Sequence, residues 1–317
     1  MISHIFAIGL ALIIDRIVGD PHGWPHPVRW LGALILKLTA KWNHPPNAFR
    51  NGFSLIFATV VAAFGTAYLL VSGAYALHWS LGFLIETLLI ASGLAQKSLR
   101  DAAEEVYQPL IQKDWSRARE KLSWIVGRDT ANLDESEITR GVVETVSENT
   151  SDGITAPLFW AFLLGAPGLW LYKAVNTCDS MVGYKNEEFA QFGYASARLD
   201  DALNFIPSRM TGALILLATK NKRNLTVRQR FAEWARDAVK HPSPNSGWLE
   251  AATAVQLGIE LGGVNTYKGV RSERARMGTP FYELEAKHIK EAVQHMHIAT
   301  IWFYILFAIG VMIIEFA

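Results

Sequence analysis

The sequence predicts an all-α, polytopic integral membrane protein with about four to six membrane helices and helical cytoplasmic loops. Half of the 317 residues are hydrophobic and eleven are tryptophan, a composition more typical of membrane proteins than of soluble domains. The formal net charge of +1 gives no electrostatic reason to expect nucleic acid as a partner. The one cysteine, Cys178, excludes an internal disulfide and a cysteine-based metal site.

The N-terminal run MISHIFAIGLALII is expected to be the first membrane helix. It is apolar enough for the core of a signal peptide, but it lacks a leading Lys or Arg and has no small-x-small cleavage site before Asp15. Three more runs, near 53–77, 79–95 and 298–314, approach the ~20 residues that cross a bilayer as a helix. We therefore assign 1–96 to N-terminal membrane helices, 97–297 to a motif-bearing region and 298–317 to a C-terminal membrane helix.

Two further apolar runs, 155–172 and 203–218, are interrupted. The breaks are Gly165, Pro167 and Gly168 in the first run and Pro207 and Arg209 in the second. Each run either spans the membrane or forms a re-entrant or buried segment. We favour the second alternative, because Pro167 and Arg209 weaken a spanning helix.

The basic residues predict which segments face the cytoplasm. Lys and Arg gather in 16–50, 97–140 and 220–240, and such clusters tend to remain on the cytoplasmic side. If neither interrupted run spans, the polar stretch between them is cytoplasmic as well. If both span, it lies outside.

Helices are expected in the polar regions too. Residues 97–125 have amphipathic spacing, and the capping signature Asp134-x-x-Glu137 predicts a helix that continues to about Glu148. Residues 220–240 predict a basic helix that stops at the turn-rich loop 241–247.

Three acids, Glu144, Glu148 and Asp152, recur every four residues at the end of the helix that follows Asp134. A solvated helix face is the ordinary explanation of such spacing. This helix, however, continues directly into an apolar run, where solvation should fall. Carboxylates at such a boundary suit Mg²⁺, which takes one or two carboxylates together with phosphate oxygens and waters.

The stretch from Tyr172 to Arg209 has the highest density of charged and amide side chains beside apolar runs. Its candidates are Asn176, Asp179, Lys185, Asn186, Arg198, Asp200, Asp201, Asn204 and Arg209. Cations and amides suit phosphate, and the acids suit magnesium. A solvated loop with an Arg198–Asp201 pair is the alternative, although an exposed pair stabilises little. No Walker A sequence occurs.

Three other groups are weaker candidates. The Pro- and Gly-rich connector 15–29, which ends at Arg29, is either one wall of a charged-ligand site or a helix exit at the interface. Residues 241–245, an expected turn at 262–267 and the basic run 271–276 are interpreted mainly as surface loops. His288, Glu291 and His295 share a helical face, but metal ligation is the less favoured explanation.

The polar motifs together resemble the adenosylcobinamide-phosphate synthases of cobalamin biosynthesis, the CbiB/CobD family. The residues that carry the resemblance, in order, are GDPHGWPHPVRWLG (19–32), GRDT (127–130), ETVSENTSDGITAPLFW (144–160), YKAVNTCDSMVGYKNE (172–187), FGYASARLDDALNFIPSR (192–209), SPNSGW (243–248) and LGGVNTYKG (261–269). As an ordered set they are specific. Loops 41–52 and 219–240 carry no signature, and Leu249 stands where we expect proline.

The resemblance implies an ATP-dependent ligation at the cell membrane, with ATP and Mg²⁺ as cofactors. Adenosylcobyric acid would supply a ring D propionate carboxylate, and (R)-1-amino-2-propanol phosphate, or free aminopropanol, would supply the amine. Membrane lipid and other cobalamin-assembly membrane proteins are further expected partners. We expect the active site on the cytoplasmic side of a multi-pass protein.

Roles for individual residues follow as hypotheses from this chemistry. The expected catalytic residues are Glu144, Glu148 and Asp179. The expected metal ligands are Glu148, Asp152, Asp179, Asp200 and Asp201. The expected substrate- or phosphate-binding residues are Lys185, Asn186, Arg198, Arg209, Asn176 and Arg29.

A non-catalytic membrane sensor and a corrinoid transporter are the alternatives. Against transport, Glu86 is the only acid well inside a confident span, whereas transport paths usually have several polar groups at membrane depth.

Overall fold

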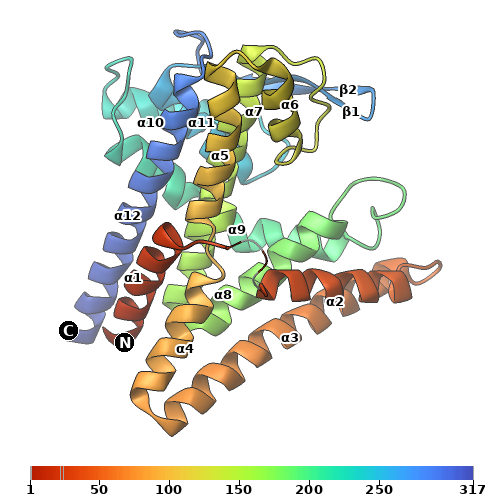
Figure 1. Ribbon diagram of the computed structural model, residues 1–317, viewed down its shortest axis with the longest axis vertical. Coiled ribbons are helices and arrows are strands. Elements are labelled where there is room, and N and C mark those ends of the chain that lie inside the picture. Colours follow the sequence, from red (N-terminus) through yellow and green to blue (C-terminus); the bar gives the residue numbers. More distant parts are fainter. Residues whose placement is uncertain (1, 22, 24, 317) are drawn as a thin grey trace. The chain divides into compact units, whose positions relative to one another are not determined.

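The computed structural model describes residues 2–21, 23 and 25–316 and is almost entirely helical (Figure 1). Helices dominate as predicted, but one antiparallel hairpin, β1 (Leu261–Tyr267) with β2 (Val270–Met277), was not expected. The chain forms two compact units. Unit 1 comprises residues 1–97, 152–204 and 306–317, and unit 2 comprises 98–151 and 205–305.

Unit 1 contains the helices of the first 97 residues, a helix and the start of a second from residues 152–204, and the end of the last helix. They are α1 (Ile2–Ile17), α2 (Pro27–Trp42), α3 (Ala48–Leu77), α4 (Trp79–Ala91), α8 (Ala156–Val182), the start of α9 (Tyr194–Ala218) and the end of α12 (Lys287–Phe316). A π-helical turn, η1 (Ser151–Thr155), precedes α8.

Among the described residues, four helical segments are long and apolar enough to cross a membrane: Ala48–Leu77, Trp79–Ile111, Glu135–Val182 and Lys287–Glu315. Three of them contain the predicted spans 53–77, 79–95 and 298–314. The fourth contains the interrupted run 155–172, so by length and composition this run qualifies as a span, contrary to the alternative we favoured. Helix α1 forms as predicted, but its 16 residues are fewer than the ~20 of a full span.

The break in 155–172 is a kink within α8. Gly165 has φ 67°, a left-handed conformation that glycine adopts without steric cost, and Pro167 removes a helical hydrogen bond just beyond it. The backbone at Gly165 is non-helical, so α8 consists of two helical parts that meet at this kink, which is how the apolar run accommodates both residues.

Glu86 of α4 is fully buried and satisfied by its neighbours. Its carboxylate accepts a hydrogen bond from the Tyr75 hydroxyl (2.9 Å) and pairs with His4 Nδ1 (2.6 Å). These contacts link α1, α3 and α4. Glu86 thus serves helix packing, and nothing in its surroundings favours the transporter alternative.

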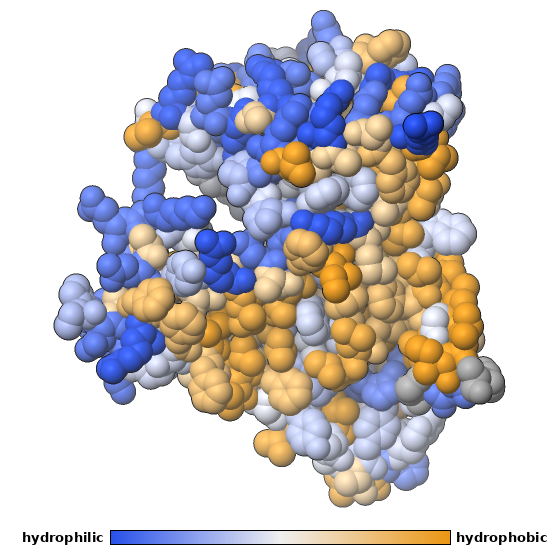
Figure 2. All heavy atoms as spheres, turned by 180° about the vertical axis from the view of Figure 1, so that it is seen from behind, coloured by the Kyte–Doolittle hydropathy of each residue, from blue (hydrophilic) through white to orange (hydrophobic). Residues whose placement is uncertain are grey.

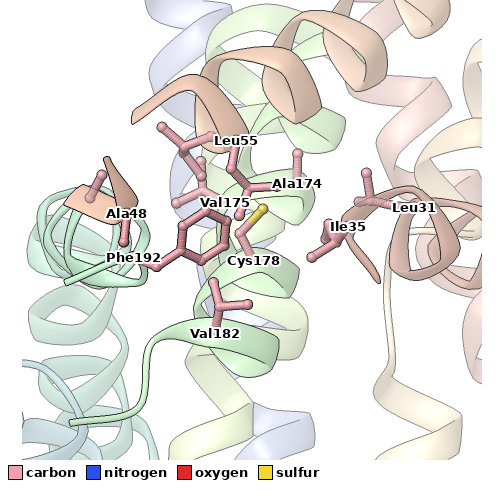
Figure 3. Close-up of a cluster of buried hydrophobic side chains, with 11 residues drawn as sticks. Leu31, Ile35, Ala48, Leu55, Ala174, Val175, Cys178, Val182 and Phe192 are labelled. Atoms are coloured by element: carbon pink, nitrogen blue, oxygen red, sulfur yellow. The ribbon is translucent and has the colours of Figure 1, made fainter. Parts of the chain in front are cut away.

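A buried apolar cluster holds α2, α3 and α8 together (Figure 3). Phe192, which precedes α9, packs beside Val175 and Cys178 of α8. A Cβ at Gly52 would lie 2.0 Å from the Phe192 carbonyl oxygen, so glycine lets α3 approach this loop. The cluster therefore fixes the C-terminal half of α8 and the entry into α9, where the predicted polar residues lie.

Helix α3 also presents large apolar side chains outward, including Phe53, Phe57, Val61 and Leu69. Figure 2 shows a broad area of such hydrophobic residues, in orange, on one face of the molecule. Exposed apolar surface of this kind is characteristic of contact with lipid or another protein, in agreement with the spanning length of α3.

Unit 2 is built mainly from shorter helices and the hairpin. They are α5 (Gln96–Ile111), α6 (Trp115–Ser123), α7 (Glu135–Thr150), α10 (Val227–Ala238) and α11 (Ser246–Leu257), with the remainder of α9 and α12. Its core gathers Trp234, Leu249, Val255 and Met277.

The sequence predicted α7 closely, α5, α6 and α10 less closely, and α11 not at all. Asp134 caps α7 as expected by accepting from the Glu137 N–H (2.9 Å), but the helix predicted over 97–125 divides into α5 and α6 at Lys113, whose φ is 61°. The expected turn at 262–267 is instead strand β1, and the chain reverses at Lys268-Gly269, both with positive φ. The glycines at 262 and 263 mark an irregularity in the strand register.

Candidate active site

A cavity of ≈ 210 Å³ with both apolar and charged walls lies in unit 1 at the junction of α8 and α9. We call it the α8–α9 cavity. Its walls are Gly183, Tyr184, Lys185, Phe189, Ala190, Gly193, Tyr194, Ala197, Arg198 and Asp201. Three predicted ligand-binding residues, Lys185, Arg198 and Asp201, thus come together in one place.

The loop between the two helices is folded by local hydrogen bonds. Helix α8 ends where the Gly183 N–H bonds to the Asp179 carbonyl (2.7 Å), and Asn186 Oδ1 accepts from the Phe189 N–H (2.9 Å). A Cβ at Gly193 would lie 1.7 Å from the Val182 carbonyl oxygen, so glycine is needed for the close return. Asn186 therefore shapes the loop, which favours a structural role over its predicted contact with phosphate.

The charges around the α8–α9 cavity favour an anion. Lys185 and Arg198 supply two cations, and α9 begins at Tyr194 with the partial positive charge of a helix N-terminus. The Arg198 guanidinium lies 5.4 Å from the Tyr194 ring centroid. Burial raises the pKa of Asp201, while Arg198 and Lys185 oppose that rise.

The carboxylate of Asp179 lies against the same wall. A Cβ at Gly183 would be 1.9 Å from Asp179 Oδ1, which places this oxygen next to a residue that lines the α8–α9 cavity. Asp179 and Asp201 together provide the one or two carboxylates that Mg²⁺ uses when phosphate and water complete its shell. The donor set therefore fits a magnesium–phosphate complex.

A complete protein cage for a metal is not formed. Within the described ranges, no group of three or more His, Cys, Asp or Glu side chains could hold a metal ion. The five predicted metal ligands, Glu148, Asp152, Asp179, Asp200 and Asp201, are therefore not assembled as one cluster. Magnesium binding remains a prediction.

Asp200 occupies a buried polar network beneath the cavity. Its two oxygens accept from Asn176 Nδ2 (3.2 Å) and Asn204 Nδ2 (3.0 Å), and the Tyr172 hydroxyl donates to Asn204 Oδ1 (2.9 Å). These contacts tie α8 to α9. They favour a positioning role for Asp200 and Asn176 in place of the predicted direct contact with ligand.

Lys173 is a charged residue of unit 1 that the sequence hypotheses missed. Its ammonium is attracted by the carboxylates of Asp152, Asp20 and Asp200. Its place beside Asn176 in the YKAVNT motif was the available signal. By contrast, Arg29 is exposed on α2 and is not part of the cavity wall. His22 and Trp24 of the 19–32 motif lie outside the described residues.

A second cavity, polar and of ≈ 150 Å³, lies in unit 2. We call it the α7–β1 cavity. Its walls are Ile125, Val126, Gly127, Arg128, Glu144, Thr145, Glu148, Asn149, Glu250, Asn265, Tyr267 and Arg274. Two of the predicted acids, Glu144 and Glu148, therefore line one cavity.

Glu144 is the centre of a buried ion-pair network. Its oxygens accept from Arg128 Nη2 (2.5 Å), Arg140 Nη1 (3.2 Å) and the Gly262 N–H (2.9 Å). Both arginines also donate to Asn265 Oδ1. Because both carboxylate oxygens are engaged, this geometry favours an anchoring role for Glu144 over the predicted role as base or metal ligand.

Glu148 is the acid that remains available to a ligand. One oxygen accepts from the Ser246 hydroxyl at 2.7 Å, and the side chain is half-buried at the cavity wall. The solvated-face explanation fails for Glu144, which is 6% exposed, and the α7 residues Ile138, Arg140 and Val142 are buried as well.

Residues interpreted from the sequence mainly as surface loops also belong to this site, so that interpretation was wrong for them. Asn265 is buried, and Tyr267 and Arg274 line the cavity. His241 Nε2 lies 3.5 Å from Glu250 Oε1. Burial, reinforced by Glu144 and Glu148, raises the pKa of Glu250 well above its ordinary value, whereas burial and then Arg274 lower the pKa of His241.

Two other candidates have structural partners within unit 2. Arg209 donates to the carbonyl oxygens of Phe205 (2.7 Å) and Pro244 (3.1 Å), and burial lowers its pKa. Its predicted contact with phosphate competes with these bonds. Glu291 pairs with Lys222 (2.6 Å), and the described residues around His288 and His295 form no metal site.

Comparison with known proteins identifies the family. Residues 8–296 match the CobD/Cbib protein family. The "Cobalamin biosynthesis protein CobD" of Halalkalibacterium halodurans is 49% identical over 308 residues, 97% of each chain. The "Cobalamin biosynthesis protein CbiB" of Salmonella typhimurium is 43% identical over 300 residues, 93% of this chain and 94% of the relative. No solved structure matches. The chain therefore belongs to the CobD/CbiB family of cobalamin biosynthesis proteins.

Proposed function

We propose that the protein is a membrane ligase that forms a carbon–nitrogen bond in cobalamin biosynthesis. It joins the ring D propionate of adenosylcobyric acid to the amine of (R)-1-amino-2-propanol phosphate, or of aminopropanol, and yields adenosylcobinamide phosphate in the first case. Family membership supports the pathway. The observation that carries the ligase assignment is the meeting of Lys185, Arg198 and Asp201 in the α8–α9 cavity, which suits the phosphate groups of a magnesium nucleotide.

The α8–α9 cavity would perform the activation half of the reaction. A carboxylate is a poor electrophile, and ATP with Mg²⁺ supplies the phosphoryl group and the charge neutralisation that make it reactive. Lys185 and Arg198 would bind the phosphate oxygens. Asp179 and Asp201 would hold the metal ion, and the buried Asp200 network would keep Arg198 and Asp201 of α9 in place.

The α7–β1 cavity would provide the proton acceptor. An amine must lose a proton as it becomes an amide nitrogen, which calls for a positioned base. Glu148 is an acid at this wall with an oxygen not engaged by a described hydrogen bond, since Ser246 bonds only to its Oε1. The Ser246 contact orients the carboxylate.

The activity is tested with the full-length protein in lipid nanodiscs. Adenosylcobyric acid, the amino-alcohol phosphate, ATP and Mg²⁺ are expected to give an amide product detectable by mass spectrometry, with one ATP consumed per product. Omission of ATP or chelation of Mg²⁺ should abolish product. Product formation without ATP, or ATP turnover that never depends on both substrates, would reject the ligase assignment.

We infer that the protein is in the cell membrane with the α8–α9 cavity on the cytoplasmic side, where ATP is present, so that the kinked run 155–172 returns to the side from which it enters in spite of its spanning length. A Lys185→Cys variant reports this well, because residue 185 is exposed and the native Cys178 is buried. A membrane-impermeant maleimide should label it only after the cells are permeabilised. Lys113→Cys, in the basic region expected in the cytoplasm, is the matched control. Labelling of residue 185 in intact cells would contradict the cytoplasmic site.

A further inference from the structure

The α7–β1 cavity contains polar groups that the proposed ligation does not yet use. Glu250 is 1% exposed and lines the cavity, and its Oε2 has no hydrogen-bond partner among the described residues. A buried polar atom without a partner carries a free-energy cost. Such a cost is recovered when a ligand supplies the missing hydrogen bond, so this oxygen points to a bound molecule.

Arg274 offers the opposite charge in the same cavity. Its guanidinium donates to the Tyr267 hydroxyl (3.2 Å) and lies near His241 Nε2 (3.4 Å), but within the described part of the chain it pairs with no carboxylate. Arg128, in contrast, is already committed to Glu144. Arg274 is therefore the cation of this site that is available to a ligand anion.

The remaining charges are complementary to a molecule that carries both signs. With Glu144 neutralised by Arg128 and Arg140, Glu148 is the available carboxylate and Arg274 is the available cation. The volume of ≈ 150 Å³ equals about five water molecules at ~30 Å³ each. This space is too small for a corrinoid or a nucleotide and suits a compound of a few heavy atoms.

We propose that the α7–β1 cavity binds a small zwitterion, with its ammonium group at Glu148 and Glu250 and its anionic group at Arg274 and Tyr267. The assignment of this ligand as the amine substrate rests on the proposed ligase function. In that case the cavity holds the amino-alcohol phosphate, and Glu148 contacts the nitrogen that becomes the amide. Arg274 then determines the preference for a phosphorylated amine over a free one.

The test measures binding by calorimetry, without ATP, to the full-length protein in nanodiscs. Ethanolamine phosphate carries both charges, ethanolamine carries only the amine, and glycerol 3-phosphate carries only the anion. The zwitterion should bind at least about tenfold more tightly than either half, since one charged contact is worth about 1.4 kcal/mol or more.

Substitutions should show separately how the anionic end and the amine end of the ligand contribute to its affinity. Arg274→Gln should weaken the binding of ethanolamine phosphate and of glycerol 3-phosphate about tenfold and leave the binding of ethanolamine unchanged. Glu148→Gln should weaken the binding of ethanolamine phosphate and of ethanolamine and leave the binding of glycerol 3-phosphate unchanged. Glu250→Gln tests the amine end a second time. Arg271→Gln, an exposed residue on the same strand, is the control and should change none of them.

The outcomes separate the site from the reaction. If the wild-type protein ligates but Arg274→Gln and Glu148→Gln bind all three probes normally, the cavity is not the amine site and only this inference fails. If the probes bind with the expected pattern while no ATP-dependent product forms, the zwitterion site stands and the ligase function fails. Equal affinity for the zwitterion and glycerol 3-phosphate would also overturn the proposal.

Discussion

A Glu144→Ala variant is expected to lose about 3–5 kcal/mol of folding stability, because removal of one partner leaves buried charges uncompensated. Arg128, Arg140 and the Gly262 N–H all donate to this carboxylate, and the three charged residues are at most 8% exposed. The loss should appear as a lower melting temperature of the protein in nanodiscs. Unfolding is monitored by the fluorescence of the unit 2 tryptophans.

Glu135→Ala is the matched control for this effect. Glu135 lies on the same helix but is exposed, so its removal should change stability by less than about 0.5 kcal/mol. A Glu144→Ala protein that has the melting temperature of the wild type but a lower activity would contradict the anchoring role. Glu144 would then have to be reconsidered as a catalytic acid or base.

Arg198→Ala is expected to lower ATP-dependent product formation by about 100- to 1,000-fold, the usual effect of removing one group that stabilises developing charge. The guanidinium lines the α8–α9 cavity, and among the described residues it contacts the Tyr194 ring. The variant should therefore keep its melting temperature. Arg198→Lys should recover only part of the rate, because lysine cannot make a bidentate contact with phosphate.

The comparison for Arg198 is Arg50→Ala, since Arg50 is an exposed arginine of unit 1 that does not line this cavity. The rate and the KM for ATP should be close to wild type in this control. If Arg198→Ala also leaves kcat/KM for ATP unchanged, the α8–α9 cavity does not bind the nucleotide phosphates. The activation half of the proposed mechanism would then need another site.

The sequence predicted features that depend on neighbouring residues. Hydrophobic runs located α3, α4 and α12, and the Asp134 cap located the start of α7. Lys185, Arg198 and Asp201 were grouped correctly because one short loop and the first turns of α9 bring them together. Such local relationships are expressed directly in residue spacing.

The α7–β1 cavity could not be predicted in the same way. Glu144 finds its partners at Arg128 and Gly262, and the second of these is 118 positions away. Glu250 stands in an alanine-rich helix that looks like ordinary core, and the hairpin carrying Tyr267 and Arg274 was taken for loops. Spacing along the chain does not report which distant elements pack together, so the acids of α7 seemed either solvated or metal-binding.

The assembly of unit 1 from three separate stretches has a consequence for biosynthesis. Helix α3 leaves the ribosome long before α8, yet the buried cluster around Leu55 and Ile56 is completed only by Val175, Cys178 and Phe192. Lipid must cover this face of the early helices while about a hundred further residues are synthesised. That synthesis takes several seconds at 5–20 residues per second. Substitutions in this buried cluster should therefore first lower the yield of inserted protein and increase the proteolysis of nascent chains.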